Sequence, residues 1–405
     1  MELLVEALLT NLNVTKNECE IVSKDFYKRF EQCKGSLSLL FGEAYMAGEW
    51  RSKDLASFFR KALTCDNVND HIFSTIKTHP IMSLKLLGHF LINDLVTQIR
   101  DILQNNQSIK LSKQVGEQHY DIPDILYEYM LDSQRQYTCG YWKPDTKTLE
   151  EAQQNKINLL IDKLQIPDDT EMNILDIGCG WGGLTHAISK RYPKCNVVGI
   201  SISKEQIKFA NDTYGSPKLK YIFCDYRDLP SEEKKYDRII SVGMFEHVGV
   251  KNYDTYFKCC HDILMDDGIF VLHTITKPFV VPLPVSLTGL MTTNDWYDKY
   301  IFPGGIVPTA EQVLHSSISN KLMYHHIQNL SISYAKTLNE WYKNFKSSWK
   351  KIHDSNPLFF TQTFYNMWEF YLLSAMISFE TKQTDLTQFV FTKRIYDGMY
   401  IFTEK

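Results

Sequence analysis

One segment constrains the fold of this chain more than any other, the sequence NILDIGCGWGG at residues 173–183. Its apolar run predicts a short buried strand, its glycines a tight turn, and residues 184–191 a helix. Four further strands are expected at residues 196–203, 218–226, 236–243 and 268–276. Helices are expected between them, for example at residues 204–215, where Gly215 ends the helix. This alternation predicts an α/β fold with a doubly wound, mostly parallel sheet.

The N-terminal part of the chain has a different pattern. Up to about residue 102 it is helical, and the clearest amphipathic stretch, RSKDLASFFRKAL, places Leu55, Phe58 and Phe59 on one face. We therefore expect a mainly helical domain at residues 1–103, a linker at 104–114 and a catalytic domain at 115–405. A further helix is expected after Thr148, which forms a capping box with Glu151. After Ile275 the sequence reads as loop-rich and then helical and aromatic.

Composition limits the function. The chain has 405 residues, 44 Lys and Arg against 48 Asp and Glu, and a net charge of −4, a balance that argues against nucleic acid as the main partner. The nine cysteines show neither a disulfide framework nor a zinc-binding spacing, so we expect a reducing compartment and no metal. No run is long enough to span a membrane, and any membrane contact is expected to be peripheral.

The glycine turn predicts a nucleotide-type cofactor. Gly178, Gly180 and Gly183 form a G-x-G-x-x-G pattern between a strand and a helix, which favours close approach of a ligand to the backbone. A dinucleotide would require an acidic residue at the end of the second strand, where this chain has Ser201. The polar residues around the turn are Asp176, Ser201, Gln206, Asp225 and Tyr226. Acids and an aromatic ring suit the cationic S-adenosylmethionine better than a pyrophosphate, although a dehydrogenase is the alternative.

Several motifs then resemble one family, the cyclopropane fatty acid synthases. They are YDIPDILYEYMLDSQRQYTCGYW (120–142), LDIGCGWGGL, VVGISISKEQ, CDYRDL, YDRIISVGMFEHVG, NYDTYF, LHTI and KYIFPGG, and they occur in the family's order. The segment FGEAYMAGEW (41–50) also resembles the family's small N-terminal domain. The resemblance implies a Rossmann-like methyltransferase fold. It implies methyl transfer from S-adenosylmethionine to a cis double bond of a membrane phospholipid, followed by ring closure.

The resemblance also implies residue roles. It assigns cofactor contacts to Tyr137, Thr138, Gly178, Gly180, Ser201, Gln206 and Tyr226, and a bicarbonate base to Cys139, Glu246, His273, Tyr334 and the backbone of Ile275. Because an alkene is a weak nucleophile, we expect a dry pocket that holds it against the methyl donor, with aromatic faces such as Phe245 beside the carbocation. A carboxylate beside bicarbonate places two like charges together, so we expect Glu246 to accept the bicarbonate O–H and a protonated or neutral donor His273 to orient it.

Alternatives stay open at this stage. A plant-type amine N-methyltransferase shares the glycine turn and the M-F-E-H segment, a methyl-branched lipid is another product of the same carbocation, and a non-catalytic lipid-binding relative is the third. Cys139 and His273 could also be ordinary core residues, and Tyr334 is assigned on a loose match.

Membrane contact is expected at the inner face, from a cytoplasmic location, with room for a homodimer. Phe58 and Phe59 with the neighbouring cations could form an interfacial helix or pack within their own domain. The apolar segment 277–293 is either a packed loop or a lid that touches the membrane.

Overall fold

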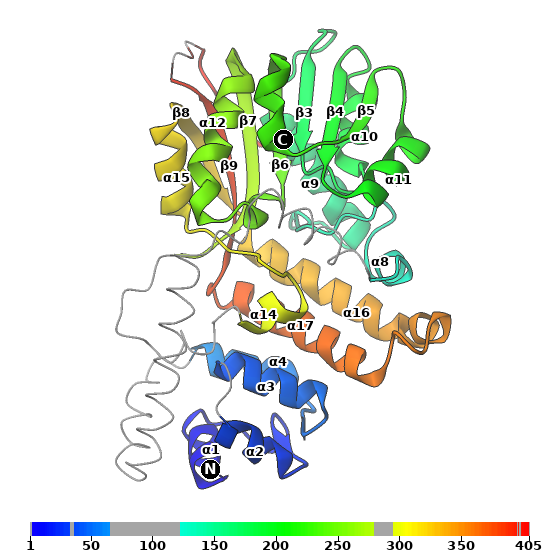
Figure 1. Cartoon of the computed structure of the whole chain (residues 1–405), viewed down its shortest axis with the longest axis vertical. Coiled ribbons are helices and arrows are strands. Elements are labelled where there is room, and N and C mark those ends of the chain that lie inside the picture. The colour runs from blue at the N-terminus through cyan, green and yellow to red at the C-terminus, as the bar shows by residue number, and fades with distance from the viewer. Residues whose placement is uncertain are drawn as a thin grey trace. The chain divides into compact units, whose positions relative to one another are not determined.

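The computed structural model describes residues 2–32, 36–64, 122–278, 295–394, 396 and 398–404. These residues form two compact units (Figure 1). One unit comprises residues 1–105, 280–303 and 338–383, and the other comprises residues 106–279, 304–337 and 384–405. The predicted linker at 104–114 and most of the apolar segment 277–293 lie outside the described residues, so the predicted domain boundaries stay predictions.

The second unit is built on a seven-stranded sheet with the order β5-β4-β3-β6-β7-β9-β8. Five strands run parallel, and β9 and β8 run antiparallel at one edge. The strands are β3 (Asn173–Ile177), β4 (Asn196–Ser201), β5 (Leu219–Phe223), β6 (Tyr236–Val242), β7 (Leu264–Thr276), β8 (Leu322–Asn329) and β9 (Asp385–Lys393). The predicted α/β fold with a doubly wound, mostly parallel sheet is thereby confirmed, and all five predicted strands are present.

Helices cover both faces of this sheet because its strands carry apolar side chains on both sides. One face packs against α9 (Leu149–Lys163), α10 (Gly183–Arg191) and α11 (Lys204–Tyr214). The other packs against α12 (Tyr253–Ile263), α15 (Ala310–Ser319) and the 3₁₀ helix η1 (Tyr226–Glu232). The predicted capping box of Thr148 and Glu151 begins α9, and Gly215 ends α11 as expected. The remaining elements of the unit are α8 (Ile125–Met130), η2 (Phe245–His247), η3 (Val250–Asn252) and the start of α16 (Ser331–Ser355).

The two antiparallel strands were not predicted from the sequence. Strand β9 lies between β7 and β8 and is almost fully buried, whereas β8 is an edge strand with a mostly exposed face. The pairing of His273 in β7 with Gln388 in β9 is the consequence of this arrangement that matters most for the site.

The first unit is helical and aromatic. Its elements are α1 (Glu2–Asn11), β1 (Glu20–Ile21), α2 (Asp25–Gln32), α3 (Leu37–Met46), β2 (Trp50–Arg51), α4 (Leu55–Thr64), α14 (Asp295–Tyr300), the later part of α16, and α17 (Gln362–Glu380). The predicted apolar face of α4 is confirmed, and its side chains are buried. Phe58 packs against Phe41 and Trp50, and Phe59 packs against Phe370 of α17.

This packing decides between the two interpretations of α4. Phe58 and Phe59 are 1% and 7% exposed, and the neighbouring Arg60 forms an ion pair with Glu380. The expectation of an interfacial membrane helix at this face is therefore wrong, because its apolar side chains are already buried inside the unit.

Candidate active site

The glycine turn joins β3 to α10 at the carboxyl edge of the sheet. Gly180 has a φ of +54°, and a Cβ at this position would meet no atom within 4 Å, so the backbone there borders open space. Gly183 has the opposite environment, because a Cβ would lie 2.6 Å from the Gln136 side chain. Gly180 thus leaves room for a ligand, and the missing side chain of Gly183 allows the segment around Gln136 to approach the turn.

Asp176 precedes this turn and is fully buried. Its Oδ2 accepts a hydrogen bond of 2.7 Å from the Thr185 hydroxyl, which connects the end of β3 to the first turns of α10. Burial raises the pKa of Asp176 to about 6. The Thr185 hydrogen bond and the charge of Lys156 oppose this shift.

The polar residues after β4 and β5 lie where the sequence predicted them. The Ser201 hydroxyl donates to Gln206 Oε1 at 3.0 Å, and both residues are buried. Asp225 is held by Arg227, whose Nε and Nη2 donate to its two carboxylate oxygens at 2.8 and 2.6 Å. The ring of Tyr226 packs against Tyr256 with a centroid distance of 5.1 Å. Parallel strands bring these positions to one edge of the sheet.

A buried lysine that sequence reasoning missed positions the segment with Tyr137, Thr138 and Cys139. Lys156 on α9 donates from Nζ to Gln136 Oε1 at 2.5 Å and to the Thr138 hydroxyl at 3.0 Å. Burial lowers its pKa to about 8, and the charges of Asp132 and Asp176 oppose this shift. The signal was available, since Lys156 interrupts the apolar face of a predicted helix.

Hydrogen bonds and strand pairing connect the backbone segments that carry four residues of the expected bicarbonate site. The Ile275 amide donates to Glu246 Oε1 at 2.7 Å. Ile275 pairs with Leu386 in β9, whose carbonyl accepts from the Leu330 amide. The Leu330 carbonyl in turn accepts from the amide of Tyr334 at 3.1 Å and lies 3.9 Å from the Cys139 Sγ. His273 is two residues before Ile275 on the same strand, so these two positions lie on the same face of β7, and the common site for all five residues stays a prediction.

Two buried atoms in this region have no hydrogen-bond partner in the described part of the chain. They are Glu246 Oε2 and His273 Nε2. Burial raises the pKa of Glu246 to about 7 and, with the charges of Lys156 and Lys163, lowers that of His273 well below its usual value. Native proteins rarely leave such groups unpaired, which makes these two atoms candidates for contact with a ligand.

The structure also limits two roles. Cys139 is fully buried, its thiol donates to the Gly140 carbonyl, and burial raises its pKa, so it is a neutral thiol and no nucleophile. The Phe245 ring is fully buried and stacks on Tyr253 at 4.6 Å. The expectation that Phe245 faces a carbocation is therefore wrong, because its ring belongs to the core.

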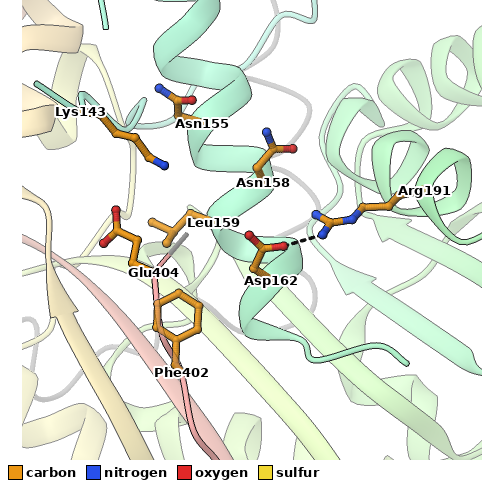
Figure 2. A pocket seen from close by; sticks show the side chains of 8 residues that line it. All are labelled: Lys143, Asn155, Asn158, Leu159, Asp162, Arg191, Phe402 and Glu404. Atoms are coloured by element: carbon orange, nitrogen blue, oxygen red, sulfur yellow. Dashed lines mark ion pairs between the residues drawn. The ribbon is translucent and has the colours of Figure 1, made fainter. Parts of the chain in front are cut away.

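A separate cavity of about 400 Å³ lies on the outer side of α9 (Figure 2). It is lined by Lys143, Asn155, Asn158, Leu159, Asp162, Arg191, Phe402 and Glu404. The Arg191 guanidinium forms an ion pair of 2.7 Å with Asp162. None of the residues assigned above lines this cavity, which is therefore distinct from the proposed active site.

Comparisons with known proteins agree with the geometry. Residues 107–389 match the model of the mycolic acid cyclopropane synthetase family. The cyclopropane-fatty-acyl-phospholipid synthase of Escherichia coli is 37% identical over 388 residues, which cover 95% of this chain and 90% of the relative. A probable fatty acid methyltransferase of Pseudomonas putida is 32% identical over 284 residues, which cover 69% of each chain.

Solved structures give the same result. The cyclopropane synthase MmaA2 of Mycobacterium tuberculosis is 29% identical and matches with a TM-score of 0.62 over 69% of this chain and 98% of that one. The mycolic acid cyclopropane synthase CmaA1 in complex with SAH and CTAB has the same identity, TM-score and coverage. This chain belongs to the mycolic acid cyclopropane synthetase family.

Proposed function

We propose that this protein is a cyclopropane-fatty-acyl-phospholipid synthase that uses S-adenosylmethionine. The observation that carries the proposal is the nearly end-to-end match to the Escherichia coli enzyme of that name, which includes the N-terminal region as well as the methyltransferase domain. The glycine turn, the buried Asp176 and the unpaired polar atoms near β7 support the same reaction.

The reaction balances as follows. The π electrons of a cis double bond form a bond to the methyl carbon of S-adenosylmethionine, and its bond to sulfur breaks to release S-adenosylhomocysteine. The resulting carbocation loses a proton from the new methyl group, and the freed electron pair closes the three-membered ring. The chain must therefore orient the alkene and the methyl donor, exclude water and provide a route for one proton.

We propose that Tyr137, Thr138, Gly178, Gly180, Ser201, Gln206, Asp225 and Tyr226 contact the cofactor. Asp176 would carry the charge that faces its cationic end, because its carboxyl is buried and its Thr185 contact leaves lone pairs unused. Lys156 positions this group by holding the Thr138 hydroxyl.

We propose that bicarbonate binds beside Cys139, Glu246, His273, Ile275 and Tyr334. The fit rests on Glu246 Oε2 and His273 Nε2, which are buried polar atoms without a partner in the described ranges. Bicarbonate would supply a small base in a site where Cys139 is a neutral thiol. A pKa of about 7 for Glu246 reduces the repulsion between two anions, because the carboxyl takes up a proton there at little cost.

A direct assay tests the reaction. The protein is incubated with methyl-labelled S-adenosylmethionine and vesicles of a cis-unsaturated phospholipid, and the fatty acids are analysed by mass spectrometry. We expect a gain of one CH₂ with loss of the double bond. A branched alkene formed by loss of a neighbouring proton would have the same mass but keep a double bond, and this product, or label found only on added amines, would overturn the proposal.

A second proposal concerns the surface through which the protein contacts the membrane. Among the described helices, none is long and apolar enough to cross a bilayer. The turn between α16 and α17 exposes Leu358, which is 94% accessible, next to Phe359, and Figure 1 shows this turn at the end of the two helices. The exposed Lys350 and Lys351 lie on the last turns of α16. We propose that this turn enters the interface of an anionic bilayer, since an apolar tip with adjacent lysines suits such a surface.

Location and assembly are proposed from the family resemblance alone. We propose a cytoplasmic protein at the inner membrane face that forms a homodimer. Cell fractionation and light scattering test these two proposals, and a monomer at working concentration would exclude the second.

A further inference from the structure

A second buried lysine on α9 is linked to His273 through one glutamine. Lys163 donates from Nζ to Gln388 Oε1 at 2.6 Å and to Gln328 Oε1 at 2.5 Å. The Gln388 Nε2 lies 3.0 Å from His273 Nδ1. All of these contacts lie inside the sheet unit, and Lys163, Gln388 and His273 are at most 1% exposed.

The donors and acceptors available on each side chain fix the direction of these hydrogen bonds. An ammonium group has donors only, so the amide of Gln388 must turn its oxygen to Lys163 and its NH₂ to His273. An NH₂ group needs an acceptor, and Nδ1 accepts only when it carries no proton. A neutral imidazole then has its single proton on Nε2.

We propose, as an inference that rests on the proposed function, that Lys163 acts through Gln388 as a positioning residue that holds His273 in the Nε2–H tautomer. His273 is then a hydrogen-bond donor at the one ring nitrogen without a partner among the described residues. Of the two forms expected from the sequence, protonated or neutral donor, the geometry assigns the neutral one. A doubly protonated ring would direct an Nδ1–H at the NH₂ of Gln388, which places two donors together.

The ammonium form of Lys163 enforces this orientation, and the neutral amine is compatible with it. Burial lowers its pKa to about 7, and the charge of Glu404 opposes this shift. A neutral amine still has two N–H donors, one for each glutamine oxygen. The ring of Phe402 lies 5.3 Å from Nζ, and the Tyr400 hydroxyl donates to the Lys163 carbonyl, so the C-terminal residues hold the lysine in place.

Two variants each place a carboxylate beside Lys163, but only Gln388→Glu changes the group that faces His273. Gln328→Glu also brings its carboxylate toward Glu404, whose Oε2 lies 3.5 Å from Gln328 Nε2. In Gln388→Glu, the carboxylate accepts from Lys163 and also from His273, so it requires a proton on Nδ1. In Gln328→Glu, the new carboxylate contacts Lys163 without touching His273, and the Gln388 amide keeps its orientation. The second variant is therefore the matched control.

The experiment reads the ring nitrogens by ¹⁵N NMR of protein labelled at histidine, with His273 assigned from a His273→Gln variant. We expect a bare Nδ1 and a protonated Nε2 in the wild type and in Gln328→Glu, and a protonated Nδ1 in Gln388→Glu. The value of kcat for lipid methylation should fall about 10- to 100-fold in Gln388→Glu, as when other partners that orient a histidine are lost. KM for S-adenosylmethionine should stay unchanged.

A wild-type spectrum with a proton on Nδ1 would overturn the proposal, as would a Gln388→Glu enzyme with normal kcat. The wild-type measurement needs the His273→Gln variant only for assignment, and it needs neither Gln388→Glu nor a lipid. It therefore decides the tautomer even if Gln388→Glu fails to fold or if the wild type forms no cyclopropane product.

Discussion

Replacing Glu246 with glutamine removes a titratable charge from the buried site and preserves its shape. The oxygen that accepts from the Ile275 amide at 2.7 Å is kept. In the wild type, burial raises the pKa of this carboxyl from 4.5 to about 7. Between those two pH values the folded protein holds a proton that the unfolded chain has released, so the wild type loses stability as the pH rises.

The size of the effect follows from these two pKa values. Integrated from pH 5 to pH 8, the wild type loses about 2.5 kcal/mol of unfolding free energy through this one group. Glutamine does not titrate, and its other effects on stability are the same at both pH values. The stability of Glu246→Gln relative to the wild type should therefore rise by about 2.5 kcal/mol across this range, with most of the change below pH 7.

Thermal unfolding followed at several pH values measures this difference. For a unit of this size, each kcal/mol corresponds to about 2–4 °C, so the gap in Tm should move by about 5–10 °C in favour of the variant. The control is Glu311→Gln on α15, where the glutamate is exposed and no such drift is expected. A gap for Glu246→Gln that stays constant from pH 5 to pH 8 would refute the argument that the carboxyl is buried without a compensating partner.

Three further predictions follow from the site and the surface. Because the pKa of Asp176 is about 6, the affinity of the wild type for S-adenosylmethionine should weaken below that pH. In calorimetry, Asp176→Asn should bind the cofactor more weakly than the wild type and with an affinity that does not change with pH. An unchanged wild-type affinity at pH 5 would contradict this. Lys156→Met removes the hydrogen bonds to Gln136 and Thr138 and should weaken cofactor binding about tenfold or more. Equilibrium binding of S-adenosylhomocysteine measures this loss. An affinity equal to that of the wild type would show that the segment with Gln136 and Thr138 keeps its conformation without Lys156. The double change Leu358→Ser and Phe359→Ser should lower sedimentation with anionic vesicles several-fold, whereas the same change at the exposed Ile327 on β8 should not; equal losses would exclude the α16–α17 turn as the docking site.

The five parallel strands could be predicted because each is a local apolar run bounded by turn residues. Strands β8 and β9 could not, since β8 has a largely exposed face and β9 follows directly after a long helix. A strand of this kind is stabilised by its neighbours in the sheet, and sequence pattern alone does not show them.

The sequence by itself determined the sheet-and-helix order and the glycine turn, because motifs and short-range periodicity are local properties. It also predicted Asp176, Cys139, Glu246 and His273 as site residues. Only the tertiary structure decided that Phe58 and Phe245 are core residues, because burial depends on contacts between distant segments. It also connected Lys163 and Gln388, which are 225 residues apart, to His273 through hydrogen bonds. The protonation state of a buried group depends on such partners, and these become neighbours only when the antiparallel edge of the sheet forms.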